Sequence, residues 1–222
     1  MLRLASSSPR RRHLLTLLGI HFETDAPDVD ERAVLSPAQA KADAVARPAE
    51  VTLAADTEID VDGERVGKPS DESHAVATLA ALSGREHEVR TEVVLVAASG
   101  TQTRFAVRSR VTMRELSLRQ IEHYVATGEP LDKAGAYAIQ GAGRRMVESY
   151  DGCLANIAGL PLCHLYFALR RVGVVARERP EVVCQAYFAF ACPVWRAAQR
   201  QGRALRDGAE YRSWSEDVSG VK

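Results

Sequence analysis

The pattern of hydrophobic and polar positions predicts a chain of short strands and amphipathic helices. Short apolar runs are typical of buried strands, strict alternation marks half-buried strands, and apolar residues three or four apart mark helices. On these criteria strands are predicted at 2–5, 51–55, 89–98, 105–113 and 146–150, and helices at 8–18, 41–46, 70–82, 117–125 and 161–173. Because strands and helices mix without strict alternation, we expect an α/β domain around a mixed sheet.

Two polar segments flank the central strand at 51–55. The segment Asp25–Pro37 is rich in acids and prolines and is predicted to be a loop. The strand itself is expected to end at Asp56-Thr57. A hairpin then follows, with Asp62-Gly63 as its tight turn.

The chain changes character after Gly173. Residues 176–180 read as a linker, 182–190 are apolar and aromatic, and 195–206 form a basic run with helical spacing. We therefore expect a main domain at 1–175 and a helical C-terminal extension at 176–222, which packs on that domain or on a second subunit. The end, Ser213–Lys222, is expected to fray. No chemistry is recognisable in the extension.

Composition limits the possible partners and compartments. The 222 residues suffice for one large domain or two small lobes, and 29 basic residues balance 29 acidic ones. A formal net charge of zero gives no global attraction to nucleic acid or anionic membranes. No apolar run approaches the roughly 20 residues of a membrane span, and no secretory signal is visible. The four cysteines lack zinc-type spacing, so we expect reduced thiols in a cytoplasmic protein.

The segment from Ser6 to Arg12 combines three hydroxyls, a proline and three guanidinium groups at the start of a helix. Serine is a preferred N-cap, and proline suits the first helical position. Cations in the first turn cost the helix roughly 0.3–1 kcal/mol each, because the helix dipole favours anions there. A bound polyphosphate would offset that cost. Two other interpretations stay open on this segment alone, a capped helix with solvated arginines and an organelle transit peptide.

Carboxylates and lysines elsewhere add candidate chemistry. Asp56 can act as a base or hold a divalent metal, although a structural turn aspartate would look the same. Asp30 and Glu31 offer further oxygen ligands. Basic residues are almost all arginine, and the internal lysines are Lys41, Lys68 and Lys133. That bias indicates a need for compact ammonium groups at these places, with chance as the alternative.

The glycine-flanked Gln140 carries an amide that suits the edge of a nucleobase, although a glutamine near glycines is a weak signal. The histidines show no metal or triad pattern, and Ser6–Ser8 lack the spacing of a serine nucleophile.

Together these segments resemble the Maf family of nucleoside triphosphate pyrophosphatases over about residues 2–173. The motifs fall in the family's order. They are Leu4-Ala5-Ser6-x-Ser8-Pro9-Arg10-Arg11, Val29-Asp30-Glu31, Lys41-Ala42-x-Ala44-Val45-Ala46, Ala55-Asp56-Thr57, Gly67-Lys68-Pro69, Leu82-Ser83-Gly84-x-x-His87-x-Val89-x-Thr91, Gly128-Glu129-Pro130-Leu131-Asp132-Lys133-Ala134-Gly135-Ala136-Tyr137-x-Ile139-Gln140-Gly141 and Gly159-Leu160-Pro161.

The resemblance implies hydrolysis of a nucleoside triphosphate between the α and β phosphorus atoms, with a divalent metal such as Mg²⁺ or Mn²⁺. It also implies a two-lobed fold around an elongated mixed β-sheet, similar to inosine triphosphate pyrophosphatases. Asp56 matches the family's proton acceptor, and Glu31 with Asp56 is assigned to the metal. The phosphate-binding residues implied are Ser6, Arg11, Lys68 and Lys133, while the part of Lys41 stays open.

The family's three specificity positions are occupied here by Arg10, Thr57 and Gln140, a combination similar to the branch that acts on dTTP and UTP. Arginine and glutamine can hydrogen-bond the carbonyl and imide groups of a pyrimidine. The alternatives are a 7-methyl-GTP pyrophosphatase and a nucleotide- or nucleic-acid-binding regulator of cell division. We expect a nucleotide substrate, no stable nucleic-acid or membrane partner, and leave a homodimer open.

Three features depart from the family pattern. The segment between Glu31 and Lys41 is shorter than is usual in the family, so we expect the mouth of the site to differ. Glu58 and Asp60 replace apolar residues, and on a strand they project to the same side as Asp56. We expect them to raise the pKa of Asp56 by like-charge repulsion or to enlarge the metal site. The extension has no family counterpart that we recognise.

Overall fold

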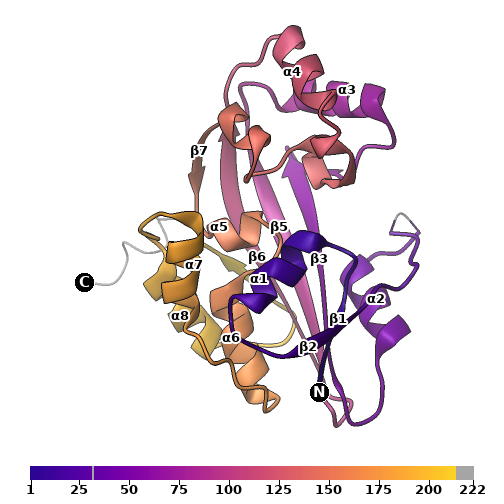
Figure 1. The fold of residues 1–222 in the computed structure, drawn as a ribbon, viewed down its shortest axis with the longest axis vertical. Coiled ribbons are helices and arrows are strands. Elements are labelled where there is room, and N and C mark those ends of the chain that lie inside the picture. Colours follow the sequence, from indigo (N-terminus) through magenta and orange to yellow (C-terminus); the bar gives the residue numbers. More distant parts are fainter. Residues whose placement is uncertain (32, 214–222) are drawn as a thin grey trace.

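Three long antiparallel strands run through both lobes of the molecule and join them (Figure 1). They are β3 (Val51–Val61), β5 (Glu86–Val96) and β6 (Gln102–Met113). The structure is a computed structural model that describes residues 1–31 and 33–213. The α/β class and the elongated sheet predicted from the sequence are therefore confirmed.

The remaining strands extend this sheet at its edges. They are β1 (Leu2–Ala5), β2 (Phe22–Asp25), β4 (Glu64–Val66), β7 (Val147–Asp151) and β8 (Ala209–Arg212). The strand order is β2-β1-β3-β5-β6-β7, with β4 beside β3 and β8 beside β6. β1 runs parallel to β2 and β3, and β8 runs parallel to β6, whereas the other pairs are antiparallel. The sheet is mixed, as predicted.

The helices divide between the two lobes (Figure 1). One lobe holds α3 (Glu72–Leu82), α4 (Leu118–Val125) and the 3₁₀ turns η1 (Glu129–Asp132), η2 (Ala134–Ala136) and η3 (Ala142–Met146). The other holds α1 (Pro9–Thr16), α2 (Pro37–Val45), α5 (Leu154–Ile157), α6 (Leu162–Arg171), α7 (Pro180–Phe188) and α8 (Trp195–Arg203). No helix among residues 1–31 and 33–213 is long and apolar enough to cross a membrane.

Both faces of the sheet are buried in the lobe that contains the N-terminus. Successive residues of β3 point to opposite faces, so Leu53 and Ala55 enter the main core. Ala54 enters a smaller core together with Ala38 and Ala42 of α2. Burial on both faces explains why Val51–Ala55 reads as an uninterrupted apolar run.

The prediction that the strand ends at Asp56-Thr57 is wrong. β3 continues to Val61, and the turn at Asp62 and Gly63, both with positive φ, then reverses it into β4 as predicted. On one side, β1 pairs with residues 51–54 of β3, and β4 pairs with residues 59–61. Of the strands that the structure describes, none covers residues 55–58 on that side. Polar residues occupy this stretch because the sheet has an open edge there.

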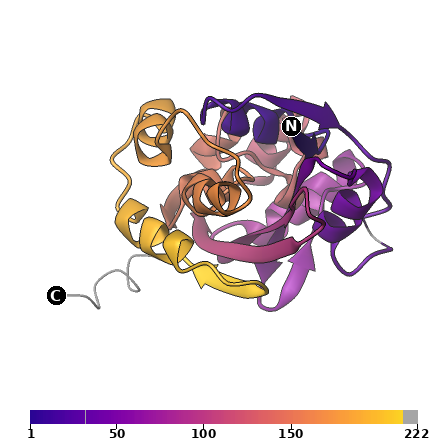
Figure 2. The same cartoon turned by 90° about the horizontal axis from the view of Figure 1, so that it is seen from below.

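The extension differs from the helical element expected. It contains α7 and α8 as predicted, but it also adds β8 to the edge of β6 (Figure 2). Ser213 was expected to fray, yet it is buried at 2% exposure. The remainder of that expectation, for residues 214–222, lies outside the described residues. β2 was also not predicted, because its four residues lie between the first helix and the predicted loop and three of them are polar.

We predict that the protein loses stability as the pH falls from about 6.5 to about 4. His87 and His164 are buried, and desolvation lowers the pKa of each to about 4. The unfolded chain therefore takes up protons in this interval that the folded protein does not. The loss should be on the order of 2–3 kcal/mol for each histidine.

The urea midpoint measured against pH tests this expectation. His164→Asn keeps a donor and an acceptor without a titrating ring, so its stability should depend less steeply on pH than that of the parent protein. An unchanged slope would contradict the assignment of this pH dependence to His164.

Candidate functional site

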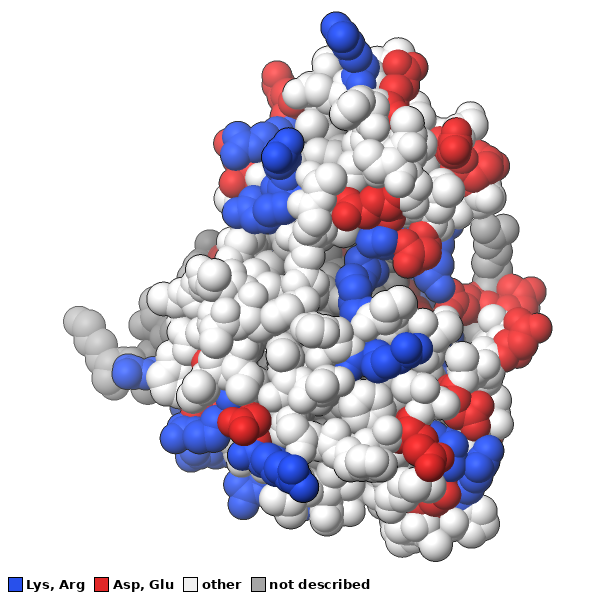
Figure 3. All heavy atoms as spheres, in the orientation of Figure 1, with Lys and Arg blue, Asp and Glu red and all other residues white. Residues whose placement is uncertain are grey.

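A cleft of about 1260 Å³ lies between the two lobes, at the open edge of the sheet. Figure 3 shows Lys and Arg side chains gathered in the hollow, with carboxylates around its rim. The sequence-predicted residues that line the cleft are Ser6, Arg10, Arg11, Glu31, Asp56, Thr57 and Lys68, and Lys41 joins them. Residues distant in the sequence thus meet in one place.

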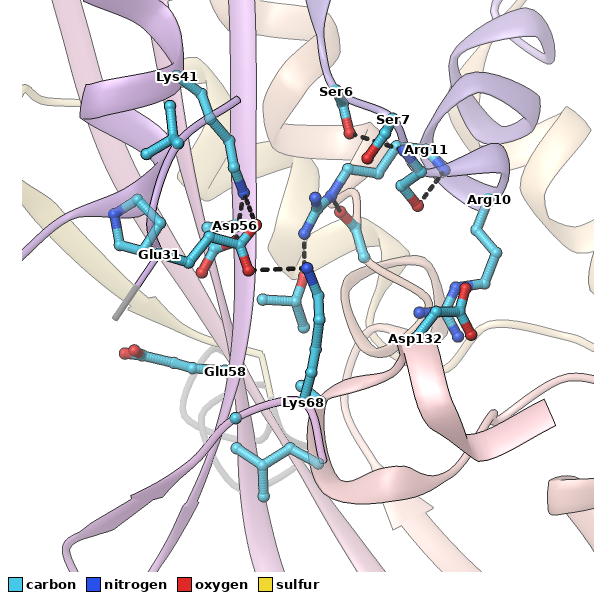
Figure 4. A pocket seen from close by; sticks show the side chains of 18 of the residues that line it. Ser6, Ser7, Arg10, Arg11, Glu31, Lys41, Asp56, Glu58, Lys68 and Asp132 are labelled. Carbon is cyan, nitrogen blue, oxygen red and sulfur yellow. Dashed lines mark hydrogen bonds and ion pairs between the residues drawn. The ribbon is translucent and has the colours of Figure 1, made fainter. Parts of the chain in front are cut away.

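Two carboxylates and two ammonium groups form a continuous chain of ion pairs in this cleft (Figure 4). Lys41 Nζ lies 2.9 Å from Asp56 Oδ1 and 2.5 Å from Glu31 Oε1. Lys68 Nζ lies 2.7 Å from Glu31 Oε2. The Asp56 and Lys41 side chains are 16% and 9% exposed, whereas Lys68 is 48% exposed. The chain therefore runs from the sheet out towards solvent.

The ammonium groups decide the ionisation of Glu31. Desolvation acts to raise its pKa, but hydrogen bonds and attraction from Lys41 and Lys68 lower the pKa to about 2. Glu31 is therefore a carboxylate at any physiological pH.

Local structure fixes the two lysines. α2, which carries Lys41, is capped by Ser36, whose hydroxyl accepts from the Gln39 N–H and donates to Glu92 on β5 (2.5 Å). Lys68 follows Gly67, whose carbonyl accepts a hydrogen bond from Gly135 N (3.1 Å). Gly135 has φ +68°, and a Cβ there would lie 2.2 Å from Ile59 Cδ1, so glycine is required for this close approach.

The start of α1 presents its arginines to the same cleft. Ser8 is the N-cap, as predicted, and its hydroxyl accepts from Arg11 N (3.4 Å). The buried Ser6 hydroxyl accepts from Ser8 N (3.2 Å). Arg11 Nη2 donates to Thr57 Oγ1 (3.0 Å), and its Nε donates to the carbonyl of Gly159 (3.1 Å). These bonds hold the guanidinium between α1, β3 and the loop after α5.

Arg10 and Arg11 are cations in a partly dry environment. Burial lowers the pKa of both guanidinium groups. The negative charges of Asp132, near Arg10, and of Asp56, near Arg11, act in the opposite direction and raise the pKa. Asp132, on η1 of the other lobe, faces Arg10 across the cleft (Figure 4). Within the part of the chain that the structure describes, neither arginine forms an ion pair. Desolvated cations without a carboxylate partner favour an anionic ligand.

Lys133 and Gln140 are not brought to the cleft wall. Lys133 Nζ donates to the Glu129 carbonyl (2.6 Å) and pairs with Asp132. Gln140 is half-buried on the loop before η3, outside the set of lining residues. The structure thus places both in the second lobe, apart from Asp56 and Arg11.

Glu58 and Asp60 do not enlarge the carboxylate cluster. Glu58 pairs with Arg90 (3.1 Å) and Arg65 (3.2 Å), and Asp60 accepts from Gly63 N (2.8 Å). Figure 4 shows Glu58 directed away from Asp56. Among residues 1–31 and 33–213, no three His, Cys, Asp or Glu side chains are grouped so that they could hold a metal ion. The expected enlargement of the metal site is therefore wrong.

Sequence reasoning missed two polar contacts of this site. Lys41 was noticed as one of three internal lysines, but nothing in its spacing indicated that it joins Asp56 to Glu31. Thr91 is directly opposite Thr57 on β5, and their hydroxyl oxygens are 3.0 Å apart. A strand register of this kind is visible only once the sheet is paired.

Comparisons with known proteins agree with the geometry. The chain is 45% identical over 190 residues to a dTTP/UTP pyrophosphatase of Anaeromyxobacter dehalogenans (strain 2CP-1 / ATCC BAA-258), covering 80% of this chain and 97% of that protein. It is 44% identical over 185 residues to a dTTP/UTP pyrophosphatase of Myxococcus xanthus (strain DK1622), covering 78% and 93%.

A solved nucleoside-triphosphatase / dITP/XTP pyrophosphatase from Mycobacterium abscessus matches at 16% identity with a TM-score of 0.34, over 52% of this chain and 74% of that one. The sequence model of the Maf-like protein family matches residues 1–172. The chain therefore belongs to the family of Maf-like proteins.

Proposed function

We propose that this protein hydrolyses dTTP and UTP to the nucleoside monophosphate and pyrophosphate. One observation carries the proposal. Asp56 lies in a cleft beside Lys41, Lys68 and the desolvated Arg11, an arrangement that suits a polyanion and a proton acceptor together. The names of the relatives support the substrate class, since each of the two cited is a dTTP/UTP pyrophosphatase.

The cations of the cleft would bind the triphosphate. Arg11 is held by Thr57 and Gly159, so its remaining N–H groups are fixed in direction before a ligand arrives. Lys68 is half exposed on a flexible stem, so it can move from Glu31 to a phosphate oxygen. Lys133 and Ser6 stay proposed phosphate contacts. For Lys133 this requires release from Asp132.

Asp56 is the proposed proton acceptor. A water molecule attacks the α phosphorus, its proton passes to the Asp56 carboxylate, and the bond from the α phosphorus to the bridging oxygen breaks to release pyrophosphate. Lys41 at 2.9 Å fixes the orientation of that carboxylate. Positioning and charge stabilisation would supply most of the rate enhancement.

Glu31 and Asp56 are the residues that would hold a divalent cation such as Mg²⁺ or Mn²⁺. The fit rests on their geometry, because both carboxylates converge on one cationic group, Lys41 Nζ. Two carboxylates completed by substrate phosphates are the usual way in which nucleotide enzymes bind Mg²⁺. When bound, the cation would neutralise charge on the triphosphate.

Arg10 and Gln140 are the proposed base-selecting residues, with Arg10 on the cleft wall nearest η1. Thr57 already accepts a hydrogen bond from Arg11, so we assign its effect on specificity to the placement of that arginine. The free state of the four cysteines supports a reducing cytoplasmic location.

A nucleotide panel tests the substrate class. With Mg²⁺ or Mn²⁺ present, pyrophosphate release from dTTP and UTP should exceed that from 7-methyl-GTP by about a hundredfold or more in kcat/KM, because polar contacts to the base discriminate strongly. A preference for 7-methyl-GTP would contradict the proposal. Tight DNA binding without pyrophosphate release would instead favour the regulator.

Asp56→Asn tests the proton acceptor. Turnover should fall on the order of 10³-fold, because an amide cannot accept the proton of the attacking water. Asp60→Asn on the same strand is the matched control and should retain turnover, since Asp60 only caps the hairpin turn. Both variants should melt cooperatively. Near-normal pyrophosphate release by Asp56→Asn would remove Asp56 from this role.

A further inference from the structure

A buried chain of hydrogen bonds connects the active-site cleft with the end of the C-terminal extension. Its members come from α1, β3, β5, β6, the segment around α5 and the residue after β8. Thr91, Ser109 and Asn156 are completely buried, and Ser213 is 2% exposed. Water therefore cannot substitute for their hydrogen bonds, and each proton in the chain needs a partner.

The first half of the chain runs from Arg11 into the protein. Arg11 Nη2 donates to Thr57 Oγ1 (3.0 Å), and Thr57 Oγ1 lies 3.0 Å from Thr91 Oγ1. The Thr91 hydroxyl donates to the main-chain carbonyl of Asn156 (3.0 Å). A hydroxyl has one proton, so Thr57 must be the donor to Thr91. The hydrogen bond to Thr91 therefore fixes the orientation of the Thr57 hydroxyl, whose oxygen accepts from Arg11.

The second half runs from Asn156 to the extension. The Asn156 amide donates to the carbonyl of Val89 (3.1 Å) and to Ser109 Oγ (3.0 Å). Ser109 Oγ lies 2.9 Å from Ser213 Oγ, and the Ser213 hydroxyl donates to the Arg108 carbonyl (2.6 Å). With its single proton used in this way, Ser213 can only accept from Ser109, whose proton faces both the Ser213 oxygen at 2.9 Å and the Cys153 carbonyl at 3.3 Å. In both halves the donors point from the cleft side towards Ser213. The halves are joined covalently through Asn156, whose main-chain carbonyl ends the first and whose side-chain amide begins the second.

Ser213 also caps the segment that carries the other contact of Arg11. Cys153 N, at the start of α5, lies 3.1 Å from Ser213 Oγ and from Ser109 Oγ. α5 leads to Gly159, whose carbonyl accepts from Arg11 Nε. The packing is tight, since a Cβ on Gly152 (φ +125°) would lie 2.9 Å from both serine oxygens. Both hydrogen-bond acceptors of Arg11 are therefore connected to Ser213.

The rest of the extension holds Ser213 in place and also hydrogen-bonds the segment just after α1. β8 pairs with residues 105–108 of β6, and Glu210 pairs with Arg90 and Arg108. At the other end, Arg177 N and Glu178 N donate to the carbonyl of Leu18, just beyond α1. The family match ends at residue 172, so all these contacts come from chain outside it.

We propose that Ser213 is a positioning residue for nucleotide binding, acting through this chain on Thr57 and Arg11, and that the extension is thereby part of the active-site scaffold. The inference rests on the proposed function for the identity of the nucleotide. The residues themselves, and their effect on Arg11, do not depend on which base is bound.

Ser213→Ala tests the proposal in the full-length protein. Its KM for dTTP should rise about three- to tenfold while kcat changes less than about twofold, because one buried hydrogen bond that orients a phosphate-binding residue is lost. The control is Tyr211→Phe, which removes a hydroxyl from the same segment. Within residues 1–31 and 33–213, that hydroxyl accepts from Arg206 N and has no bond to the chain of Ser213. The KM of this control should not change. Equal effects of the two variants would overturn the proposal.

A double-mutant cycle with Thr91→Val separates action through the chain from local loosening. If Ser213 acts through Thr91, Ser213→Ala should raise KM in the parent protein but have little further effect in Thr91→Val. Strictly multiplicative effects on KM would overturn the proposal. Should Ser213→Ala fail to fold, Ser213→Cys, with a weaker donor and acceptor, takes its place in the cycle.

Binding of inorganic tripolyphosphate, measured by calorimetry without metal, tests the positioning role of Ser213 independently of the proposed function. A protein that releases no pyrophosphate from dTTP fails the proposed function, but its tripolyphosphate affinity still reports on Arg11. Ser213→Ala should weaken that affinity about three- to tenfold relative to Tyr211→Phe. Equal affinities of the two variants would overturn the positioning role even in an active enzyme.

Discussion

The gap in strand pairing along one side of β3 is the constraint on which the site depends. β1 stops opposite Ala54 and β4 begins opposite Ile59, so residues 55–58 lie at an open edge of the sheet while β5 still holds them from the other side. Adjacent strand residues point to opposite faces. Asp56 therefore meets Lys41 of α2 on one face, and Thr57 meets Arg11 of α1 on the other. A ligand at this open edge can therefore contact the residues on both faces of the sheet.

Charge in the cleft is balanced by contacts that a polyanion can exchange. Glu31 accepts from two ammonium groups, and its low pKa shows how strongly they favour its charged form. Arg11 has no such partner among the described residues and is held instead by a hydroxyl and a carbonyl, which orient it without neutralising it. The site thus keeps Arg11 available to an anion, beside two lysines that can be shared between carboxylates and phosphates.

The sequence predicted elements wherever burial is uniform. β1, the apolar half of β3, the capped helices α1 and α4, and the Asp62-Gly63 turn all follow from local patterns. The continuation of β3 did not, because the polar residues from Asp56 to Asp60 resemble a loop when the neighbouring strands are unknown. Family motifs indicated Asp56, Arg11 and Lys68, but they could not show that Lys133 pairs with Asp132 or that Glu58 pairs with Arg90.

Ser213 shows why such contacts escape a sequence-based argument. A serine near the end of a polar tail carries no periodicity, and nothing nearby in the sequence requires it. Its importance follows from the hydrogen-bond partners in a buried network, where each hydroxyl has one proton and water cannot replace a missing partner. Without its oxygen, the Ser109 proton is left with the Cys153 carbonyl at 3.3 Å, and the Arg108 carbonyl loses a hydroxyl donor. Unpaired buried groups are more costly than a hydrogen bond is worth, so the network holds its arrangement as a unit. A tail that supplies the last acceptor of such a network helps to set the geometry at its other end.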